Sequence, residues 1–269
     1  MEFLESVGVT PKKSMSQNFL IDGNITRKIV ETAGVAKGDV VLEIGSGPGS
    51  LTEELLLRGA TVLAVEKDRK LAEALRRLDP SGKRLFIFHE DIMKWSLEEE
   101  LPKHLKEGQK AKVIANLPYH ITTPILTHLV PKNTLLSDII VMVQDEVGRR
   151  FTAKPDTNDY GSITLFLGFW STPKYAFKVS RKCFYPAPKV DSAIITFHLH
   201  VPPAEVDPER FFEITRRAFE QRRKMMRSSL RELCPDIAEA LVKADLLETS
   251  RPEELSLEEF INLYHFLQE

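Results

Sequence analysis

Short apolar runs recur along the first two hundred residues, and amphipathic helical stretches lie between them. The runs are rich in β-branched or aromatic residues, and such near-continuous apolar character is typical of strands covered on both faces. They lie at residues 40–44, 61–65, 85–88, 112–115 and 139–143. This alternation predicts βαβ units and a doubly wound α/β domain with a parallel sheet.

Two later apolar runs, residues 175–179 and 193–199, flank a proline-rich loop. We expect these runs to close the sheet with an antiparallel edge. The prolines of residues 201–203 end the alternation, and the patterns after them are helical. The sequence therefore predicts an α/β domain over residues 1–203 and a small all-helical domain over residues 204–269.

Residues 211–233 have the periodicity of one amphipathic helix. One side carries the apolar residues Phe212, Phe219, Met226, Leu230 and Leu233. A separate arc carries the basic residues Arg216, Arg217, Arg223, Lys224, Arg227 and Arg231. The simpler interpretation is an ordinary solvated face, and the alternative is an array that binds the phosphates of a nucleic acid.

The overall charge argues mildly against a nucleic-acid partner, because 37 basic and 39 acidic residues give a net charge of −2. Basic residues are nevertheless clustered. Residues 216–231 contain seven cations and one acid, and residues 174–189 contain five cations and no acid. A polyanion partner therefore stays open.

The composition and the two cysteines indicate where the protein works. Hydrophobic residues make up 42% and charged residues 28%, which is ordinary for a globular protein. Cys183 and Cys234 form no CxxC pair, and neither a signal peptide nor an apolar run of about 20 residues is present. We therefore expect a reduced, soluble protein of the cytoplasm without a membrane partner.

A glycine-rich turn follows the first predicted strand, with Gly45, Gly47 and Gly49 at alternate positions before a predicted helix. Such a turn lets a ligand approach the backbone, and the helix N-terminus supplies N–H donors. The spacing differs from GxGxxG, because Ser50 occupies the last position and Pro48 removes a donor. A tight turn with no ligand remains the simpler alternative.

Two acidic residues come after the next two predicted strands. Glu66 ends the second strand, 21 residues after Gly45, where an acid commonly accepts hydrogen bonds from ribose hydroxyls. Asp91 follows the third strand, where its carboxylate could accept a bond from an adenine amino group. Ligands of open α/β sheets bind outside the carboxyl ends of strands. The three features together favour a ligand site over solvated loop carboxylates.

The fourth predicted strand ends at Asn116-Leu117-Pro118-Tyr119. An exocyclic aromatic amine is a poor nucleophile, and the Asn116 oxygen and the Leu117 carbonyl can accept its two N–H bonds. Pro118 fixes the direction of that carbonyl, and Tyr119 offers a face for stacking a base. Catalysis here would depend on positioning and electrostatics. A simple turn after a strand is the alternative.

Four segments resemble motifs of the S-adenosylmethionine-dependent rRNA adenine N6-dimethyltransferases, and most closely the bacterial small-subunit branch. They are residues 16–22 (SQNFLID), 43–49 (EIGSGPG), 116–119 (NLPY) and 184–193 (FYPAPKVDSA). The resemblance covers most of residues 12–230. It departs from the family pattern at Ser16, Ser162 and Ser228.

The resemblance implies a Rossmann-like class I methyltransferase fold, with residues 1–203 as the catalytic domain and residues 204–269 contributing to rRNA binding. It also implies methyl transfer from S-adenosylmethionine to N6 of two adjacent adenines. These adenines lie in a hairpin loop near the 3′ end of small-subunit (16S) rRNA. The implied partner is this rRNA in a pre-30S particle during ribosome biogenesis. We expect a monomer that uses no metal.

The resemblance also implies roles for individual residues. The predicted donor-binding residues are Asn18, Leu20, Gly45, Gly47, Glu66, Asp91 and Asn116. The predicted catalytic residues are Asn116, Leu117, Pro118, Tyr119 and Phe184, with the target base sandwiched between Tyr119 and Phe184. The predicted RNA-binding residues are Arg216, Arg223, Arg227 and Arg231.

Other interpretations remain open. The protein could methylate large-subunit (23S) rRNA, or it could be a non-catalytic RNA-binding factor of ribosome assembly that retains the fold. A nicotinamide dehydrogenase is disfavoured by the glycine spacing. His198 and His200 would share one strand face, but no further ligand completes a metal site with them.

Overall fold

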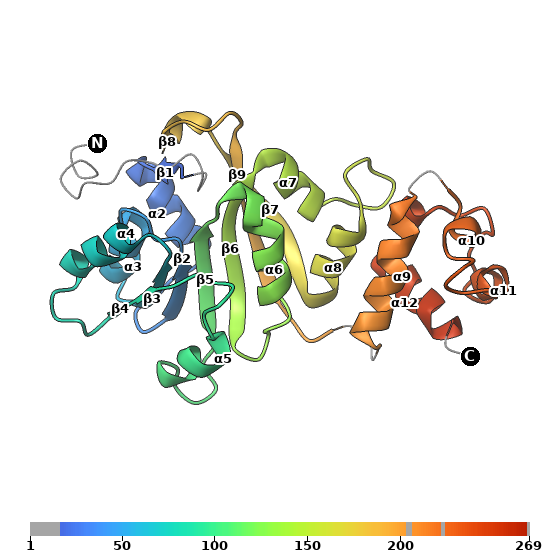
Figure 1. Ribbon diagram of the computed structural model, residues 1–269, viewed down its shortest axis with the longest axis horizontal. Helices are drawn as coiled ribbons and strands as arrows, with labels where there is room; N and C mark the ends of the chain where they lie inside the picture. Colours follow the sequence, from blue (N-terminus) through green and yellow to red (C-terminus); the bar gives the residue numbers. More distant parts are fainter. Residues whose placement is uncertain (1–16, 203–205, 222–223, 268–269) are drawn as a thin grey trace. The chain divides into compact units, whose positions relative to one another are not determined.

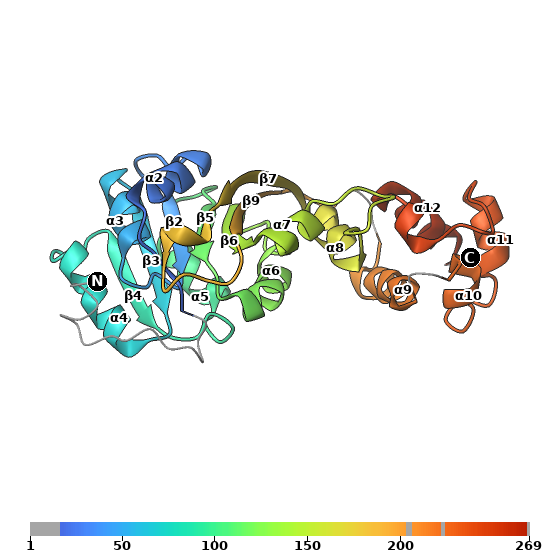
Figure 2. The same cartoon turned by 90° about the horizontal axis from the view of Figure 1, so that it is seen from above.

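The computed structural model describes residues 17–202, 206–221 and 224–267, which form two compact units (Figures 1 and 2). The first unit contains the described residues up to Gly148 together with Thr172–His200. The second contains Arg149–Ser171 and the described residues from Val201 onward. The predicted α/β fold with an additional helical part is confirmed.

The first unit is built on a seven-stranded sheet, as far as the described residues show. The strands, in spatial order, are β4 (Leu85–His89), β3 (Thr61–Glu66), β2 (Val40–Ile44), β5 (Ala111–Asn116), β6 (Leu136–Gln144), β9 (Ser192–Leu199) and β7 (Ser171–Val179). The pairs from β4 to β6 are parallel, whereas β9 runs antiparallel to β6. Because Ile44 is level with both Val65 and Ala115, strands β2, β3 and β5 end at the same edge.

Helices cover both faces of this sheet. Figure 2 shows α2 (Gly23–Thr32) and α3 (Ser50–Leu57) on one face and α6 (Thr122–Leu129) on the other. The side chain of Asp22 caps α2 by accepting bonds from the backbone of Asn24 (2.9 Å) and Ile25 (3.3 Å). Further helices of this part are α4 (Arg69–Leu75), η2 (Arg76–Leu78), α5 (Leu97–Glu100), η3 (Leu101–Lys103) and η4 (Tyr119–Ile121). Helix α7 (Asp145–Phe151) begins in this unit and ends in the second.

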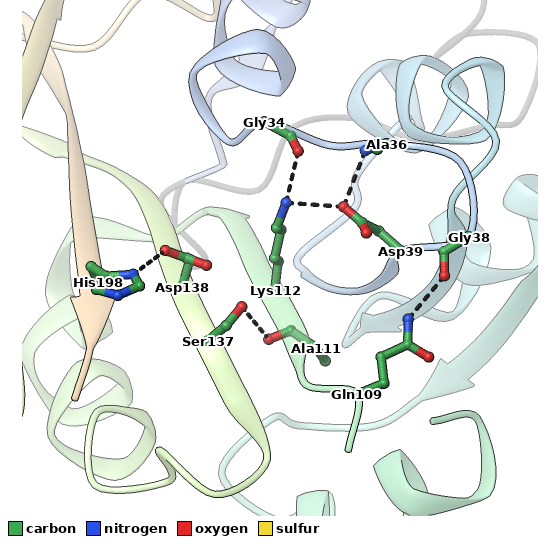
Figure 3. Close-up of polar contacts among 10 residues, drawn as sticks. All are labelled: Gly34, Ala36, Gly38, Asp39, Gln109, Ala111, Lys112, Ser137, Asp138 and His198. Carbon is green, nitrogen blue, oxygen red and sulfur yellow. Dashed lines mark hydrogen bonds and ion pairs between the residues drawn. The ribbon is translucent and has the colours of Figure 1, made fainter. Parts of the chain in front are cut away.

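Polar contacts at the amino ends of the strands hold the loop before β2 against β5 (Figure 3). Lys112 Nζ donates to the Gly34 carbonyl (2.7 Å) and to Asp39 Oδ2 (2.9 Å), and Gln109 Nε2 donates to the Gly38 carbonyl (2.9 Å). These contacts tie two neighbouring strands together. They therefore support the register that aligns the opposite, carboxyl edge.

A separate two-stranded ribbon joins segments far apart in the sequence. Strand β1 (Phe19–Leu20) pairs antiparallel with β8 (Phe184–Tyr185), and the two lie side by side in Figure 1. A further backbone bond runs from the Ile21 N–H to the Cys183 carbonyl (2.9 Å), at the end of η5 (Arg181–Cys183). The ribbon thus attaches residues near the N-terminus to the proline-rich loop.

The second unit is helical and has an aromatic core. Its helices are α8 (Ser162–Trp170), α9 (Pro208–Glu220), α10 (Met226–Ser229), α11 (Ile237–Lys243), η6 (Pro252–Glu254) and α12 (Leu257–Phe266). Phe169 stacks on Phe211, and Phe219 stacks on Phe260. The residues before Ser171 pack with the C-terminal helices, so the predicted single boundary at residue 203 omitted a segment of this unit.

The prediction of one helix over residues 211–233 is wrong. Helix α9 ends at Glu220, and the chain leaves the helical region at Gln221 (φ −124°, ψ 60°) before α10 begins at Met226. The Met226 N–H instead bonds to the Ser250 carbonyl (2.8 Å), and its side chain is fully buried. The periodicity was misleading because two short helices fill one core with the same apolar residues.

Candidate active site

A cavity of about 270 Å³ opens where strands β2 to β5 end. Most of the predicted donor and catalytic residues line it, although they come from five separate segments of the chain. They are Asn18, Gly45, Gly47, Glu66, Asp91, Asn116, Leu117, Pro118 and Tyr119. The cavity thus combines the motifs that the sequence singled out separately.

The glycine-rich turn forms one wall of this cavity. Gly47 has a positive φ of 56°, and a Cβ atom there would lie 3.2 Å from the ring of Phe19. Gly49 has φ 92° at the start of α3, and a Cβ atom would lie 2.7 Å from Leu78. A side chain is excluded at both points because Phe19 packs against Gly47 and Leu78 packs against Gly49. Of these two glycines only Gly47 lines the cavity, together with Gly45.

Glu66 is held in place by the turn itself. Its Oε2 accepts a bond from the Gly47 N–H (2.9 Å), and its Oε1 accepts one from the Asp68 N–H (2.8 Å). Burial raises the pKa of Glu66, and these two backbone bonds oppose the rise. Each carboxylate oxygen has a second lone pair, so Glu66 can also accept hydroxyl groups from a ligand.

Asp91 is placed at the same edge but is more exposed. Lys67 Nζ lies 2.7 Å from its Oδ2, and the Met93 N–H donates to its Oδ1 (3.0 Å). The bond from Lys67 is the main reason that the pKa of Asp91 is lowered. The apolar side chains of Ile92 and Met93 line the cavity beside this ionised acceptor, which suits a flat heterocycle.

Asn116 ends β5, and its amide group is oriented by the segment before the ribbon. Its Nδ2 donates to the Asn18 carbonyl (3.3 Å), which directs the amide oxygen to the opposite side. The Pro118 carbonyl accepts bonds from the Ile121 N–H (3.1 Å) and the Thr122 hydroxyl (3.3 Å). These bonds fix the turn that carries Leu117 and Tyr119 into the cavity wall.

The hydroxyl of Tyr119 is held by a residue of strand β9. The Tyr119 oxygen lies 2.8 Å from Ser192 Oγ, at the start of β9, and Ser192 is fully buried. Burial raises the pKa of Tyr119. Ser192 had no predicted role, although it belongs to the 184–193 motif.

Phe184 does not line the cavity. It is 3% exposed and packs in the core of the first unit, paired with Leu20 across the ribbon. In this conformation the structure does not present Tyr119 and Phe184 to the two faces of a base. A base sandwiched between them would require the Phe184 ring to leave this core.

Leu20 also faces the core and not the main cavity. Its neighbour Phe19 lines that cavity instead and lies against Gly47. Phe19 was not predicted as a site residue, because a two-residue strand has too little alternation to show which side chain points inward. Leu20 lines only a smaller cavity of about 40 Å³ beneath the turn.

Glu43 lies in that smaller cavity and was missed as well. Thr52 donates to its Oε2 (2.6 Å), but no group in the described part of the chain bonds to its Oε1. Burial raises the pKa of Glu43 to about 7, against the opposing effect of Thr52. A glutamate between two apolar strand residues could have signalled this buried carboxyl.

The predicted RNA-binding arginines do not share one helix face. Arg216 is exposed on α9, whereas Arg227 lies on α10 and pairs with Glu248 (3.4 Å). Arg231 follows α10 and is exposed, and Arg223 lies outside the described residues. The expected continuous array is therefore wrong, because the helix that should carry it is interrupted.

Two further features are absent from the residues that the structure describes. No group of three or more His, Cys, Asp and Glu side chains is arranged to hold a metal ion there. No helix of that part of the chain has both the length and the apolar character needed to cross a membrane.

Two solved structures resemble this chain in fold. A dimethyladenosine transferase from Plasmodium falciparum aligns with a TM-score of 0.77 at 21% identity, covering 91% of this chain and 95% of that one. The 23S rRNA methyltransferase ErmE aligns with a TM-score of 0.71 at 25% identity, covering 94% of this chain and 100% of that one. The first likeness concerns the fold alone.

Sequence comparisons are more specific. The chain is 57% identical to Ribosomal RNA small subunit methyltransferase A of Protochlamydia amoebophila, over 98% of this chain and 94% of that protein. It is 46% identical to the protein of the same name from Chlamydia trachomatis, over 99% and 96%. Residues 8–269 match the family described as Ribosomal RNA adenine dimethylase. The chain therefore belongs to the ribosomal RNA adenine dimethylase family.

Proposed function

We propose that this protein transfers methyl groups from S-adenosylmethionine to the N6 amines of two adjacent adenines in small-subunit (16S) rRNA. The acceptor lies in a hairpin loop near the 3′ end of that rRNA, within a pre-30S particle in the cytoplasm. The observation that carries the proposal is one cavity that combines Glu66 and Asp91 with the Asn116–Tyr119 segment. The names of relatives at 57% and 46% identity support the small subunit as substrate.

The cavity fits this methyl donor. Glu66 offers free lone pairs to ribose hydroxyls, and Asp91 is an ionised acceptor beside the apolar slot formed by Ile92 and Met93. Gly45 and Gly47 line the cavity, and Gly45, whose Cβ position would meet only the Asn116 carbonyl (3.8 Å), leaves room for the methionine part against the backbone. When bound, S-adenosylmethionine supplies an electrophilic methyl group.

The chain's own residues prepare the acceptor amine. Asn116 Oδ1, which faces away from the Asn18 carbonyl, accepts one N–H, and the Leu117 carbonyl accepts the other. These two bonds pull the nitrogen out of conjugation with the ring, so that its lone pair becomes available. Tyr119 stacks on the flipped base, and no dedicated general base is required.

A second transfer to the same nitrogen uses the same groups. Each transfer leaves the donor as a neutral thioether and makes the nitrogen cationic, and the nitrogen then releases one proton to water. One N–H remains after the first transfer, so one of the two acceptors is sufficient to hold the amine for the second step. After the second step no N–H remains, and both bonds are lost. The dimethylated base is therefore held less tightly than the substrate, which favours its release.

Incubation with labelled S-adenosylmethionine tests the proposal. Under-methylated small subunits and large subunits are supplied separately, and the labelled bases are mapped. We expect label on N6 of two adjacent adenines of 16S rRNA and none on large subunits. Label on 23S rRNA would assign the function that ErmE's name describes. Binding without transfer would instead indicate a non-catalytic assembly factor.

A further inference from the structure

The outer face of the β1–β8 ribbon carries large side chains that face solvent. Tyr185 is 37% exposed and Ile21 is 61% exposed, whereas Phe184, the neighbour of Tyr185, is 3% exposed. The alternation along β8 thus puts one aromatic ring into the core and the next one outside. Together with the exposed cations Arg181, Lys182 and Lys189, these residues form what we call the ribbon surface.

The ribbon surface borders the candidate active site. Phe19 lines the main cavity and is the register partner of Tyr185. Asn18, the residue before Phe19, accepts the bond from Asn116. A strand of nucleic acid that places one base in the cavity can therefore continue across this ribbon. All of these residues belong to the first unit.

The charge of the ribbon surface is not balanced locally. Among the described residues, no carboxylate lies within ion-pairing distance of Arg181, Lys182 or Lys189. Asp191, the acid of this loop, is already occupied, because it accepts bonds from Lys178 Nζ (2.9 Å) and from the Arg181 N–H (3.0 Å). The Arg181 guanidinium donates to the Lys189 carbonyl (3.2 Å), which leaves its charge without a carboxylate partner. Its charge and those of Lys182 and Lys189 therefore remain available to an anionic partner.

We propose that the ribbon surface binds the RNA strand next to the target adenine, with an unpaired base stacked on Tyr185 and neighbouring phosphates on Lys182, Lys189 and Arg181. The inference rests on the proposed function and extends it to the path of the substrate. An exposed aromatic ring among cations is the arrangement with which proteins hold single-stranded nucleic acid. Stacking tolerates any base, so this surface contributes affinity and not sequence choice.

Direct binding of an RNA tests the ring. The probe is a fluorescent single-stranded adenine-rich oligonucleotide, titrated with the full chain. Loss of one stacked base should weaken binding by about 5- to 100-fold in Tyr185→Ala. Tyr185→Phe keeps the ring and should bind within about 2-fold of wild type. An unchanged affinity of Tyr185→Ala overturns the proposal.

A charge variant tests the cations independently of any effect on the ribbon's folding. Lys182→Gln with Lys189→Gln should lower the slope of log affinity against log salt by about 1.4, from roughly 0.7 per phosphate of a single strand. The matched control is Lys83→Gln with Lys110→Gln, which removes two exposed cations before β4 and β5, at the opposite edge. Equal slopes in the two double variants overturn the proposal.

Two controls separate this inference from the proposed function. Calorimetric binding of S-adenosylmethionine should not change in any of these variants, because none of the altered side chains lines the cavity. If wild type methylates small subunits and the ribbon variants bind and react normally, only the ribbon inference fails. If wild type methylates nothing while the ribbon variants still lose oligonucleotide binding, only the proposed function fails. A variant that weakens subunit binding but not oligonucleotide binding would assign the surface to a ribosomal protein and overturn the proposal.

Discussion

The cavity of the first unit and the basic segment of the second unit hold their polar side chains in opposite ways. Glu66 is buried and bonded at both oxygens to backbone N–H groups. Arg217, by contrast, pairs at the surface with Glu220 (2.7 Å) and Glu232 (2.5 Å). Surface ion pairs contribute little stability and exchange partners easily. Transfer chemistry needs fixed geometry, whereas phosphate binding needs only available charge, so the contrast agrees with the roles proposed for the two regions.

The largest effect on activity is expected in the cavity, at Asn116. Asn116→Ala removes the amide that holds the amine, so turnover should fall by about 10²-fold or more while both substrates still bind. Single-turnover methylation of under-methylated subunits measures this. The matched control is Asn133→Ala, which removes another asparagine bond to a backbone carbonyl, that of His200 (2.8 Å), away from the cavity. Equal losses in the two variants would remove Asn116 from the mechanism.

The burial of the Glu43 carboxyl makes the stability of the folded state depend on pH. The folded pKa of Glu43 is about 7, above its ordinary value of 4.5, so the folded state keeps a proton that the unfolded state releases. Stability contributed by the neutral form is complete below pH 4.5 and is lost as pH rises to 7. The loss is at most about 3 kcal/mol for such a shift.

Glu43→Gln removes this titration and keeps the size of the side chain. Its stability relative to wild type should increase between pH 4.5 and about 7 and then stay level, as measured by urea unfolding. Glu73→Gln is the control, because the pKa of this exposed carboxyl is lowered by Arg69 and its effect has the opposite sign. A difference between Glu43→Gln and wild type that does not depend on pH contradicts the assignment.

Donor binding should depend on Glu66 more than RNA binding does. In Glu66→Ala the two ribose bonds to a charged acceptor are lost, each worth at most about 1.5–3 kcal/mol, and ribose hydration offsets part of this. We expect S-adenosylmethionine affinity to fall by roughly 10- to 100-fold by calorimetry. Glu66→Gln, which keeps one acceptor for the turn, should lose less. Unchanged donor affinity in the alanine variant would reject the role.

The sequence was sufficient to predict the sheet and most of the cavity. Parallel strands end at one edge, so Glu66, Asp91 and Asn116 had to meet once the order of strands was recognised. The glycines and the 116–119 segment consist of residue types that few other roles require, so they indicate a ligand site by themselves. Such features are local in the sequence, and the fold brings them together without further information.

Other features could not be predicted, because they depend on contacts between residues that are distant in the sequence. Helix α9 ends at Gln221, and after this break Met226 bonds to Ser250, a residue distant in the sequence. The bond between Tyr119 and Ser192 joins two motifs separated by 73 positions, and neither motif alone indicates it. The burial of Phe184 likewise depends on its pairing with Leu20.

The bond between Tyr119 and Ser192 allows a smaller, pairwise test of pre-organisation. Ser192→Ala and Tyr119→Phe each remove one partner, and each should reduce methylation by about 5-fold, equivalent to about 1 kcal/mol. If Ser192 acts by positioning the ring, the double variant should be no slower than the slower single variant. Donor affinity should not change. Additive losses would indicate that the two hydroxyls act separately.

The smallest effect is expected in the basic segment, where ion pairs compete with phosphates. Arg231 is exposed, so if it contacts a phosphate, Arg231→Gln should lower the salt slope of subunit binding by roughly 0.7–0.9. Arg217 must first leave Glu220 and Glu232, so Arg217→Gln should lower the slope by less. Glu232→Gln weakens this competition and should strengthen binding slightly. Equal slopes for Arg217→Gln and Arg231→Gln between 50 and 200 mM salt would show that local pairing does not limit phosphate binding. The contrast between the two regions would then concern geometry alone, because the charges of the second unit would be as available to RNA as those of the ribbon surface.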